Sequence, residues 1–410
     1  MEASVAVVGL GRVGLPLALS FADRGLRTMG VERQQEVLDQ LSAGRMPFSE
    51  TGTQDVLGRV VEGGRLELTR AVQDAAQADH IVLTPHTPSY VHIEIDISHV
   101  RGVIDDLLPV LREGHSLILR STVAPGTTEW VAGYLEQRRG FHVGEDLFVS
   151  HVPERIAENH FLEEIATLPC IIGGVGEGSG AKAAELFEVF GAEIVQTTPV
   201  QAELAKIWTN ILRYTQFALP NLLMMESEQY GANVFDVIDL INRDYPRGGI
   251  ARPGLTAGAC LRKDFTFSEE RSSSPGMLLA VSRVHETVPL FLVKGLKARL
   301  GELRDRKIAV LGLTFKRDSD DLRDSLSFKL VRLLERELAH VARHDPHVRA
   351  GTDPLDAALD GAEAVVIATN HSAFEDLLDR LPDGMLLVDP WNVTGSGRVF
   401  GTVHERAAVE

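Results

Sequence analysis

The chain has 410 residues, more than one compact core usually holds, so we expect two to three domains. Its 41 Lys and Arg against 58 Asp and Glu give a formal net charge of −17, so no nucleic-acid partner is expected, and an anionic ligand would need locally placed basic or backbone N–H groups. The two cysteines, Cys170 and Cys260, lie too far apart for a disulfide framework or a zinc cage, which favours a reducing compartment.

Short apolar runs alternate with helical patterns from the start of the chain. The opening MEASVAVVGLG is typical of a first strand rather than of a signal peptide, and no apolar run approaches the ~18 residues of a membrane span, so we expect a cytoplasmic protein. The runs lie at 4–8, 26–31, 81–83, 116–119, 147–149 and 170–172. Strands that alternate with helices predict a mostly parallel sheet, here in a domain over 1–197, with Cys170 as a buried structural thiol.

The strand signal disappears at about residue 198. Residues 198–242 are helical in character, interrupted by Pro220 and Gly231, and a Gly/Pro-rich loop and a second helical run follow. We expect a helical domain over 198–300, with the helix around Trp208 buried nearly all round. At Lys307 a strand again enters a Gly turn, so the third domain is expected over 301–410. The predicted fold is α/β, with two Rossmann-like domains joined by a central all-helical segment.

Residues 9–14 read GLGRVG, directly after the first strand and at the start of a helix. Gly9 permits the tight turn, Gly11 lets the backbone approach a pyrophosphate, and Gly14 lets helix and strand pack closely. Glu32 ends the second strand, where an acid can bind ribose hydroxyls and repel a 2′-phosphate, so NAD is favoured over NADP despite the adjacent Arg33. A packing turn that binds nothing is the alternative.

Two polar segments follow later strands of the first domain. STVAPGTTE (121–129) suits the ligand-binding edge of a parallel sheet, although Thr122 and Thr127 could equally cap the following helix. In HVPERIAEN (151–159), Pro153 presents Glu154 and Arg155, for which a plain salt bridge is the alternative to a functional role.

Two further segments lie in the helical region. In AELAKIWTN, Lys206 and Asn210 are one turn apart on one helix face. In GACLRKD, Cys260 follows a Gly/Pro loop and precedes Lys263 and Asp264, and neighbouring ammonium groups would favour its thiolate. The residues alone leave open whether this thiol is a nucleophile.

These segments, in this order, resemble the UDP-glucose/GDP-mannose dehydrogenase family, the nucleotide-sugar 6-dehydrogenases, along nearly the whole chain. The matching motifs are GLGRVGLPLA, STVAPGTTE, PERIAE, AELAKIWTNILRY, PGLTAGACLRKD and GLTFKRDSDDLRDS, with ATNHSAF and VDPWN as C-terminal landmarks. The resemblance implies a four-electron oxidation of a sugar C6 alcohol to a carboxylate with two NAD⁺ in turn. This reaction requires no metal.

The resemblance also implies roles for individual residues. Cys260 would form a thiohemiacetal and then a thioester, and Lys206 and Asn210 would stabilise an oxyanion or orient a water. Asp264 would activate that water through Lys206, Glu154 would transfer a proton in hydrolysis, and Thr122 would help to position water. The expected cofactor contacts are Gly9, Gly11, Arg12, Val13, Gly14, Glu32, Thr84, Pro85, Ser121, Thr122 and Arg323. The expected substrate contacts are Glu154, Arg155, Lys206, Asn210, Arg247, Gly254, Gly258, Phe315 and Lys316.

Arg247 looks like the arginine that this family supplies from a neighbouring subunit, which implies a homodimer. The chain departs from the family pattern in the approach to the thiol, which is Ala257-Gly258-Ala259-Cys260. A second departure is Pro390–Trp391, where many members have an arginine, and Arg398 is a possible substitute. His86, His92 and His99 form no recognisable metal set.

The wording PERIAE resembles members that act on UDP-N-acetylhexosamines, such as UDP-N-acetylmannosamine or UDP-N-acetylglucosamine, with Arg155 at the 2-acetamido carbonyl. A UDP-glucose 6-dehydrogenase is the close alternative. A nucleotide-sugar-binding paralogue without turnover is a further one. A β-hydroxyacid or 6-phosphogluconate type dehydrogenase would leave the second α/β domain unexplained.

Overall fold

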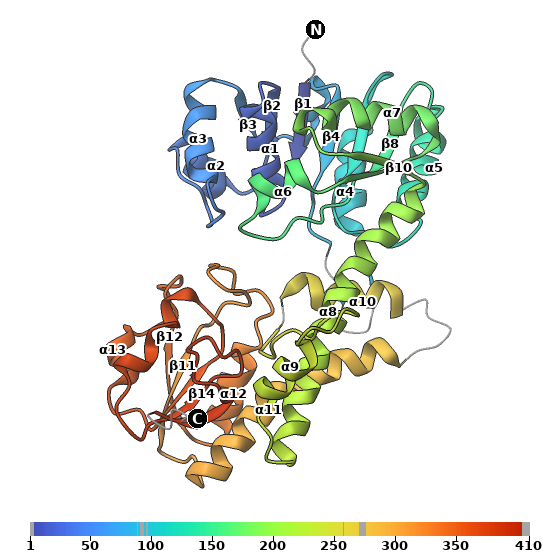
Figure 1. Ribbon diagram of the computed structural model, residues 1–410. Coiled ribbons are helices and arrows are strands. Elements are labelled where there is room, and N and C mark those ends of the chain that lie inside the picture. The colour runs from blue at the N-terminus through green and yellow to red at the C-terminus, as the bar shows by residue number, and fades with distance from the viewer. Residues whose placement is uncertain are drawn as a thin grey trace. The chain divides into compact units, whose positions relative to one another are not determined.

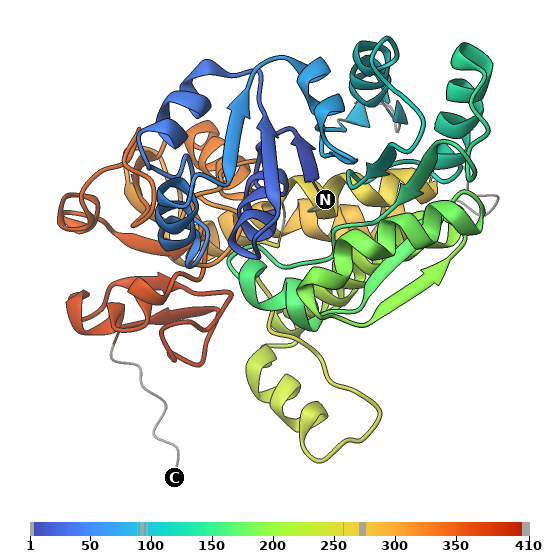
Figure 2. The ribbon, with the colours of Figure 1, turned by 90° about the horizontal axis from the view of Figure 1, so that it is seen from above.

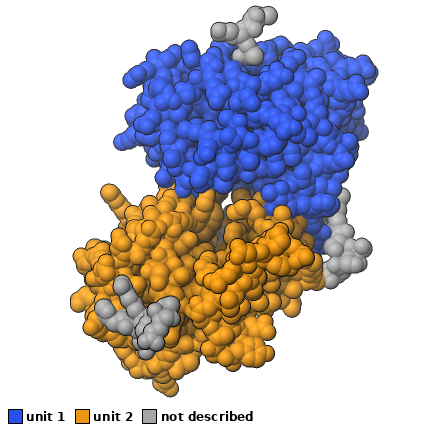
Figure 3. Space-filling view, viewed as in Figure 1, with its two compact units in different colours: residues 1–209, 266–271 blue, residues 210–265, 272–410 orange. Residues whose placement is uncertain are grey.

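The computed structural model describes residues 4–87, 89–90, 94–95, 97–256, 258–269 and 276–403. The chain divides into two compact units, Met1–Thr209 with Thr266–Arg271 and Asn210–Phe265 with Ser272–Glu410 (Figure 3). Each unit contains one large sheet, and each is described by itself below. No helix in the described part of the chain is long and apolar enough to cross a membrane.

Unit 1 is built on an eight-stranded sheet with the order β10-β9-β8-β7-β4-β1-β2-β3. Neighbouring strands are parallel except β8 and β9. The chain order changes direction between β1 and β4, and in such sheets ligands bind beyond the carboxyl ends of the strands at this point. The strands are β1 (Ser4–Val8), β2 (Arg27–Val31), β3 (Leu66–Thr69), β4 (His80–Leu83), β7 (Ser116–Leu119), β8 (Phe148–His151), β9 (Cys170–Gly174) and β10 (Ile194–Thr197).

Helices cover both faces of this sheet (Figures 1 and 2). Val5 and Val7 of β1 belong to one apolar core and Ala6 and Val8 to the other, because successive strand side chains point to opposite faces. The helices are α1 (Gly14–Asp23), α2 (Gln35–Ser42), α3 (Thr53–Glu62), η1 (Val72–Gln77), α4 (Ser98–Leu107), α5 (Thr127–Arg139), α6 (Phe161–Thr167), α7 (Gly176–Phe187) and η2 (Glu188–Phe190), and a short hairpin joins β5 (Ser89–Tyr90) to β6 (Glu94–Ile95).

Unit 2 has a five-stranded sheet with the order β12-β11-β13-β14-β15, parallel except for β15 at its edge. The strands are β11 (Lys307–Leu311), β12 (His340–His344), β13 (Ala364–Ile367), β14 (Leu386–Val388) and β15 (Phe400–Thr402). The helices are α9 (Val234–Asn242), the first part of α10 (Ala259–Glu269), whose residues from Thr266 on belong to unit 1, α11 (Met277–Leu300), α12 (Ser327–Arg336), α13 (Leu355–Leu359), η3 (Ser372–Phe374) and η4 (Leu377–Arg380). Residues of α9, α11 and α12 share a core with one face of the sheet.

Helix α8 (Pro199–Gln229) is continuous, with its first part in unit 1 and the rest in unit 2 (Figure 1). The expected interruption at Pro220 is wrong, because the helix continues through this residue and ends only before Gly231, whose φ is 65°. The prediction of two Rossmann-like α/β domains with a helical segment between them is confirmed.

Candidate functional site

The Gly-rich turn after β1 requires two of its glycines. Gly9 has a φ of 99°, and Thr84 Oγ1 donates to its carbonyl oxygen at 2.6 Å. A Cβ on Gly14 would lie 1.9 Å from the Gly9 carbonyl oxygen, so no larger residue fits where α1 begins. A Cβ on Gly11 would meet no atom within 4 Å. The turn therefore has an open glycine, Gly11, ahead of a helix N-terminus, as a pyrophosphate site requires. Val13 is the N-cap residue of α1.

Glu32 closes this turn from the end of β2. Its carboxylate accepts the Leu10 N–H at 2.9 Å and the Gln34 N–H at 3.0 Å, and each oxygen keeps a lone pair for a ribose hydroxyl. The neighbouring Arg33 guanidinium lies 2.9 Å from Asp106 Oδ2 on α4. Because Asp106 engages the one cation next to Glu32 in the sequence, the arrangement favours a free ribose over a 2′-phosphate.

Arg12 connects the Gly-rich turn to the segment after β8. Its Nη1 lies 2.6 Å from Glu158 Oε1, and its guanidinium lies over the Phe48 ring at 5.1 Å. The turn after β4 is joined to the turn after β7 by two hydrogen bonds. Ser121 Oγ donates to the Pro85 carbonyl at 2.6 Å, and the Thr87 hydroxyl donates to the Thr122 carbonyl at 2.7 Å.

Helix α5 is capped from α8. Glu203 is 1% exposed, and its carboxylate accepts the N–H groups of Gly126 at 2.6 Å and Thr128 at 2.8 Å and the Thr128 hydroxyl at 2.6 Å. The Thr127 hydroxyl donates to the Ala124 carbonyl, and Gly126 is the N-cap residue. The alternative in which Thr122 or Thr127 caps this helix is therefore wrong, because a buried carboxylate from another helix takes that place.

Glu154 is paired with Arg120 rather than with Arg155. Arg120 Nη2 lies 2.5 Å from Glu154 Oε2, both residues are buried, and Glu154 Oε1 also accepts the Ile156 N–H at 2.7 Å. Arg155 is partly exposed and donates to the Pro169 carbonyl at 2.5 Å. The plain salt bridge between Glu154 and Arg155 is thus not formed, since a long-range buried partner holds the carboxylate.

In unit 2, Asn210 Nδ2 donates to Asp264 Oδ2 at 2.6 Å, with the aspartate fully buried. This bond joins α8 to α10, the helix that has the exposed Cys260 in its first turn. Lys263 Nζ lies 3.9 Å from Asp264 Oδ1. Lys206, assigned to unit 1, precedes Asn210 by one turn of α8, so their side chains leave the same face of that helix.

Helix α8 is not buried all round, contrary to the sequence expectation. Trp208 is 57% exposed and Leu212 58%, and Leu219 and Leu222 continue the same stripe. The adjacent Ile207, about 100° around the helix from Trp208, is fully buried. The expectation failed because apolar residues on several faces of a helix do not show which of those faces the rest of the chain covers.

Aromatic rings from the C-terminal domain lie against the loop before Cys260. A Cβ on Gly254 would lie 2.3 Å from the Trp391 ring, and one on Gly258, whose φ is 105°, would lie 2.6 Å from the Phe315 ring. Trp391 belongs to the Pro390–Trp391 pair, the second departure from the pattern of the resembled family, and its Nε1 donates to the Ala368 carbonyl at 3.1 Å. Ala257 and the side chain of Ala259 lie outside the described residues.

The remaining predicted substrate and cofactor residues of unit 2 lie apart from Cys260 in the sequence. Arg323 forms a two-bond ion pair with Asp321, with Nη2 to Oδ2 at 2.6 Å. The Lys316 carbonyl accepts the Thr314 hydroxyl at 3.0 Å. Arg247 is exposed and stacks over the Tyr245 ring at 5.4 Å.

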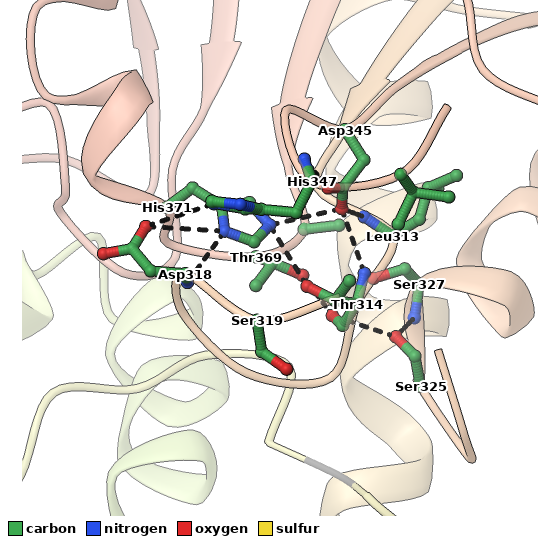
Figure 4. A network of polar contacts seen from close by, with 12 residues as sticks. Leu313, Thr314, Asp318, Ser319, Ser325, Ser327, Asp345, His347, Thr369 and His371 are labelled. Atoms are coloured by element: carbon green, nitrogen blue, oxygen red, sulfur yellow. Dashed lines mark hydrogen bonds and ion pairs between the residues drawn. The ribbon is translucent and has the colours of Figure 1, made fainter. Parts of the chain in front are cut away.

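A polar network closes the Gly turn after β11 (Figure 4). Asp345 Oδ2 accepts the N–H groups of Leu313 at 2.6 Å and Thr314 at 3.1 Å, and His371 Nε2 lies 3.2 Å away. Burial alone would raise the pKa of Asp345, but the hydrogen bond and charge of His371 and the backbone N–H groups outweigh it, so the pKa lies below its usual value.

Asp318, His347 and His371 of this network are metal-ligating residue types, with ligand atoms within 4.8 Å of one another. The His371 Nδ1 atom, however, accepts the Asp318 N–H at 3.0 Å, and its Nε2 atom faces Asp345. Both ring nitrogens are thus used within the network, which makes the cluster structural. His99 Nδ1 contacts the His86 carbonyl at 2.9 Å, and His92 lies outside the described residues.

Comparisons with known proteins agree with this geometry. Three models of the UDP-glucose/GDP-mannose dehydrogenase family match, the NAD binding domain at 3–191, the central domain at 200–287 and the UDP binding domain at 309–396. A UDP-N-acetyl-D-mannosamine dehydrogenase from Pyrococcus horikoshii is 33% identical, over 91% of this chain and 90% of that protein. The chain belongs to this dehydrogenase family.

Other members of the UDP-glucose/GDP-mannose dehydrogenase family are similar over the same length. An NDP-N-acetyl-D-galactosaminuronic acid dehydrogenase from Ralstonia solanacearum is 30% identical, over 94% of this chain and 95% of that protein. The structure of a UDP-glucose dehydrogenase from Pyrobaculum islandicum has a TM-score of 0.86 at 29% identity, and the match covers 99% of this chain and 96% of that one. The predicted family and its NAD cofactor are confirmed.

Sequence reasoning about this family member missed Arg120 and Glu203. Arg120 directly follows β7, and Glu203 lies three residues before Lys206 on α8. The signal that could have indicated Glu203 is its place within AELAKIWTN, an apolar helix segment in which a carboxylate needs a partner.

Proposed function

We propose that the chain is an NAD-dependent 6-dehydrogenase of a UDP-N-acetylhexosamine, with UDP-N-acetylmannosamine favoured and UDP-N-acetylglucosamine next. The observation that carries the proposal is the buried bond between Asn210 and Asp264, which fixes α8 against the helix that presents Cys260. The name of the Pyrococcus relative supports the favoured sugar. UDP-glucose is the second candidate, because the Pyrobaculum dehydrogenase is comparably similar in structure.

Cys260 acts as the nucleophile. When bound, NAD⁺ accepts the hydride that leaves C6 in each of the two oxidations. The hydroxyl proton of the first oxidation goes to a water activated by Asp264 and Lys206. The Cys260 thiolate then adds to the aldehyde carbon, a C–S bond forms, and the oxygen takes up a proton to give a thiohemiacetal. In the second oxidation that proton passes to the same water, the second hydride leaves C6, and a thioester results.

Hydrolysis releases the product. Water adds to the thioester carbon, the C–S bond breaks, and the thiolate of Cys260 leaves as the uronate forms. Glu154, held by Arg120, takes the proton of the attacking water, and Thr122 positions that water. The ammonium of Lys206 and the amide of Asn210 stabilise the oxyanions of these steps.

The domains supply the binding groups. We propose NAD binding by 1–197, a helical segment over 198–300 and nucleotide-sugar binding by 301–410. NAD is held by the Gly-rich turn, with Arg12, Val13 and Glu32, by the turns after β4 and β7, and by Arg323. In these two turns the NAD contacts are Thr84 and Pro85 after β4 and Ser121 and Thr122 after β7. The nucleotide sugar is held by Arg155, Arg247, Gly254, Gly258, Phe315 and Lys316.

The enzyme acts as a homodimer in the cytoplasm. The exposed stripe of Trp208, Leu212, Leu219 and Leu222 supports pairing of α8 with a second copy, since water-exposed apolar side chains gain free energy on burial. The exposed Arg247 then reaches the substrate of the neighbouring subunit. Static light scattering of the full chain measures the oligomeric state, and a strictly monomeric active enzyme contradicts this part.

The test is the Cys260→Ala variant, assayed with a panel of UDP-sugars by NADH appearance. We expect two NADH per sugar from the wild-type enzyme, and loss of uronate formation in Cys260→Ala with the Kd for NAD within twofold. Cys170→Ser is the matched control and should keep its activity, because Cys170 packs, partly buried, against the core of unit 1 that contains Val5 and Val7, and burial raises the pKa of its thiol. Normal uronate formation by Cys260→Ala would contradict the mechanism, and one NADH per sugar would indicate a simple alcohol dehydrogenase.

A further inference from the structure

A buried chain of hydrogen bonds in unit 2 connects α11 to the loop before Cys260. The Gly254 N–H donates to Asn221 Oδ1 at 2.8 Å, Asn221 Nδ2 lies 3.3 Å from His285 Nδ1, and His285 Nε2 lies 2.8 Å from the Tyr214 carbonyl oxygen. Asn221 is fully buried and His285 is 1% exposed. All four residues belong to the same compact unit, so these contacts lie within one body.

The groups at the two ends of this chain of hydrogen bonds (the relay), the Gly254 N–H and the Tyr214 carbonyl, fix which atom donates in each bond. A backbone N–H only donates, so the amide oxygen of Asn221 must face Gly254 and its NH₂ must face His285. A carbonyl oxygen only accepts, so the proton of neutral His285 sits on Nε2, facing Tyr214, and Nδ1 is free to accept from Asn221. The imidazole therefore selects one of the two possible orientations of the Asn221 amide, the one that holds Gly254.

The held glycine lies in a segment with little room to move. Gly254 and Gly258 lie against the rings of Trp391 and Phe315, as described above. Beyond Cys260, Arg262 Nη2 lies 2.7 Å from Glu286 Oε1, and Glu286 is the residue after His285 on α11. Helix α11 thus contacts the chain on both sides of the thiol. Before the thiol the contact is indirect, from His285 through Asn221 of α8 to Gly254, and after it Glu286 contacts Arg262 directly.

We propose that His285 and Asn221 are positioning residues that set the place of the Cys260 thiol, His285 by orienting the Asn221 amide and Asn221 by holding Gly254. The proposal rests on the proposed function only for its effect on catalysis. Neither residue needs to touch substrate or cofactor for it to hold. Its structural part concerns the loop itself and can be measured without turnover.

The experiment compares His285→Leu with His285→Gln in the full-length enzyme. Both changes remove the stacking of His285 on the Tyr214 ring, which has a centroid distance of 4.3 Å, so this loss cancels between them. Gln can accept from Asn221 and donate to Tyr214, which preserves the order of the relay, whereas Leu interrupts it. Asn221→Ser, which opens the relay without adding bulk, is the second interrupting variant if His285→Leu does not fold.

Asn233→Ala controls for lost stability. Asn233 caps α9 in the same unit by accepting the Phe235 N–H at 3.1 Å, and loss of such a cap costs about 1 kcal/mol. The readouts are the rate of Cys260 alkylation by iodoacetamide, resolved from Cys170 by peptide mass spectrometry, the amide exchange of a peptide spanning 250–256, and kcat.

We expect His285→Leu and Asn221→Ser to change the Cys260 alkylation rate at least fivefold, to lose amide protection in the peptide and to lower kcat at least tenfold, with the Kd for NAD within twofold. His285→Gln and Asn233→Ala should stay within twofold of wild type in alkylation. Equal alkylation rates and equal exchange in His285→Leu and His285→Gln would overturn the proposal. An active Cys260→Ala enzyme would refute the proposed mechanism but would leave this comparison decisive for the loop.

Discussion

Two glycines of the turn after β1 separate the folding of unit 1 from its binding of NAD. In Gly14→Ala the new methyl group would meet the Gly9 carbonyl oxygen at 1.9 Å and Thr84 Oγ1 at 2.5 Å, so α1 must shift away from β1. Overpacking of this kind costs about 1–3 kcal/mol. In Gly11→Ala the methyl group meets nothing within 4 Å, and the φ of Gly11 is not positive, so the folded chain accommodates it. Its stability should be unchanged or up to about 1 kcal/mol higher, because alanine restricts the unfolded chain.

Binding should show the opposite pattern for Gly11→Ala. A methyl group on the open side of the turn prevents close approach of a pyrophosphate, and we expect at least a tenfold weaker Kd for NAD, about 1.4 kcal/mol. Urea unfolding measures stability and isothermal titration calorimetry measures the Kd. Gly11→Ala that binds NAD within twofold of wild type would refute the assignment of the turn as the pyrophosphate site. An unchanged unfolding midpoint in Gly14→Ala would refute the steric argument.

Two further predictions concern pH and cofactor choice. Burial lowers the pKa of His80 and of His285 to about 4, so between about pH 6.5 and pH 4 the unfolded chain binds protons that the folded chain does not, and stability falls as the pH falls. Each histidine should lower the free energy of unfolding by about 2 kcal/mol between pH 7 and pH 5. In His285→Gln the contribution of His285 is absent, so the urea midpoint should shift less over this pH range than in wild type. An equal shift in wild type and variant would contradict this. Replacing Glu32 by Ser and Asp106 by Ala removes both acids near Arg33, so the ratio of kcat/KM for NADP to that for NAD should rise at least tenfold, and adding Arg33→Ala should reverse the gain. No change in the ratio would show that these acids do not set cofactor choice.

The sequence predicted the sheets and the dinucleotide turn because these depend on local patterns. A β-branched run that enters GLGRVG is legible from neighbouring residues, as is the acid at the end of the second strand. The same holds for Lys206 and Asn210, whose common helix face follows from their spacing alone.

Long-range partners could not be predicted in this way. Arg120 and Glu154 follow two adjacent parallel strands, so their pairing depends on the strand order of the sheet. Glu203 reaches the N-terminus of α5 from α8 by tertiary packing. The exposed face around Trp208 was predicted wrongly because apolar composition favours burial but does not indicate which side of a helix the rest of the fold covers.

Each of the two large sheets has an acid directly after the strand that neighbours its first strand, Glu32 after β2 and Asp345 after β12. The Glu32 carboxylate accepts two backbone N–H groups, those of Leu10 and Gln34, and has further lone pairs that can accept a sugar hydroxyl. The Asp345 side chain is fully enclosed, and in addition to Leu313, Thr314 and His371 it accepts the His347 N–H at 2.8 Å. The contacts of Asp345 join the turn after β11 to the loops after β12 and β13, so this acid has a structural role, whereas Glu32 keeps acceptor positions for a ligand.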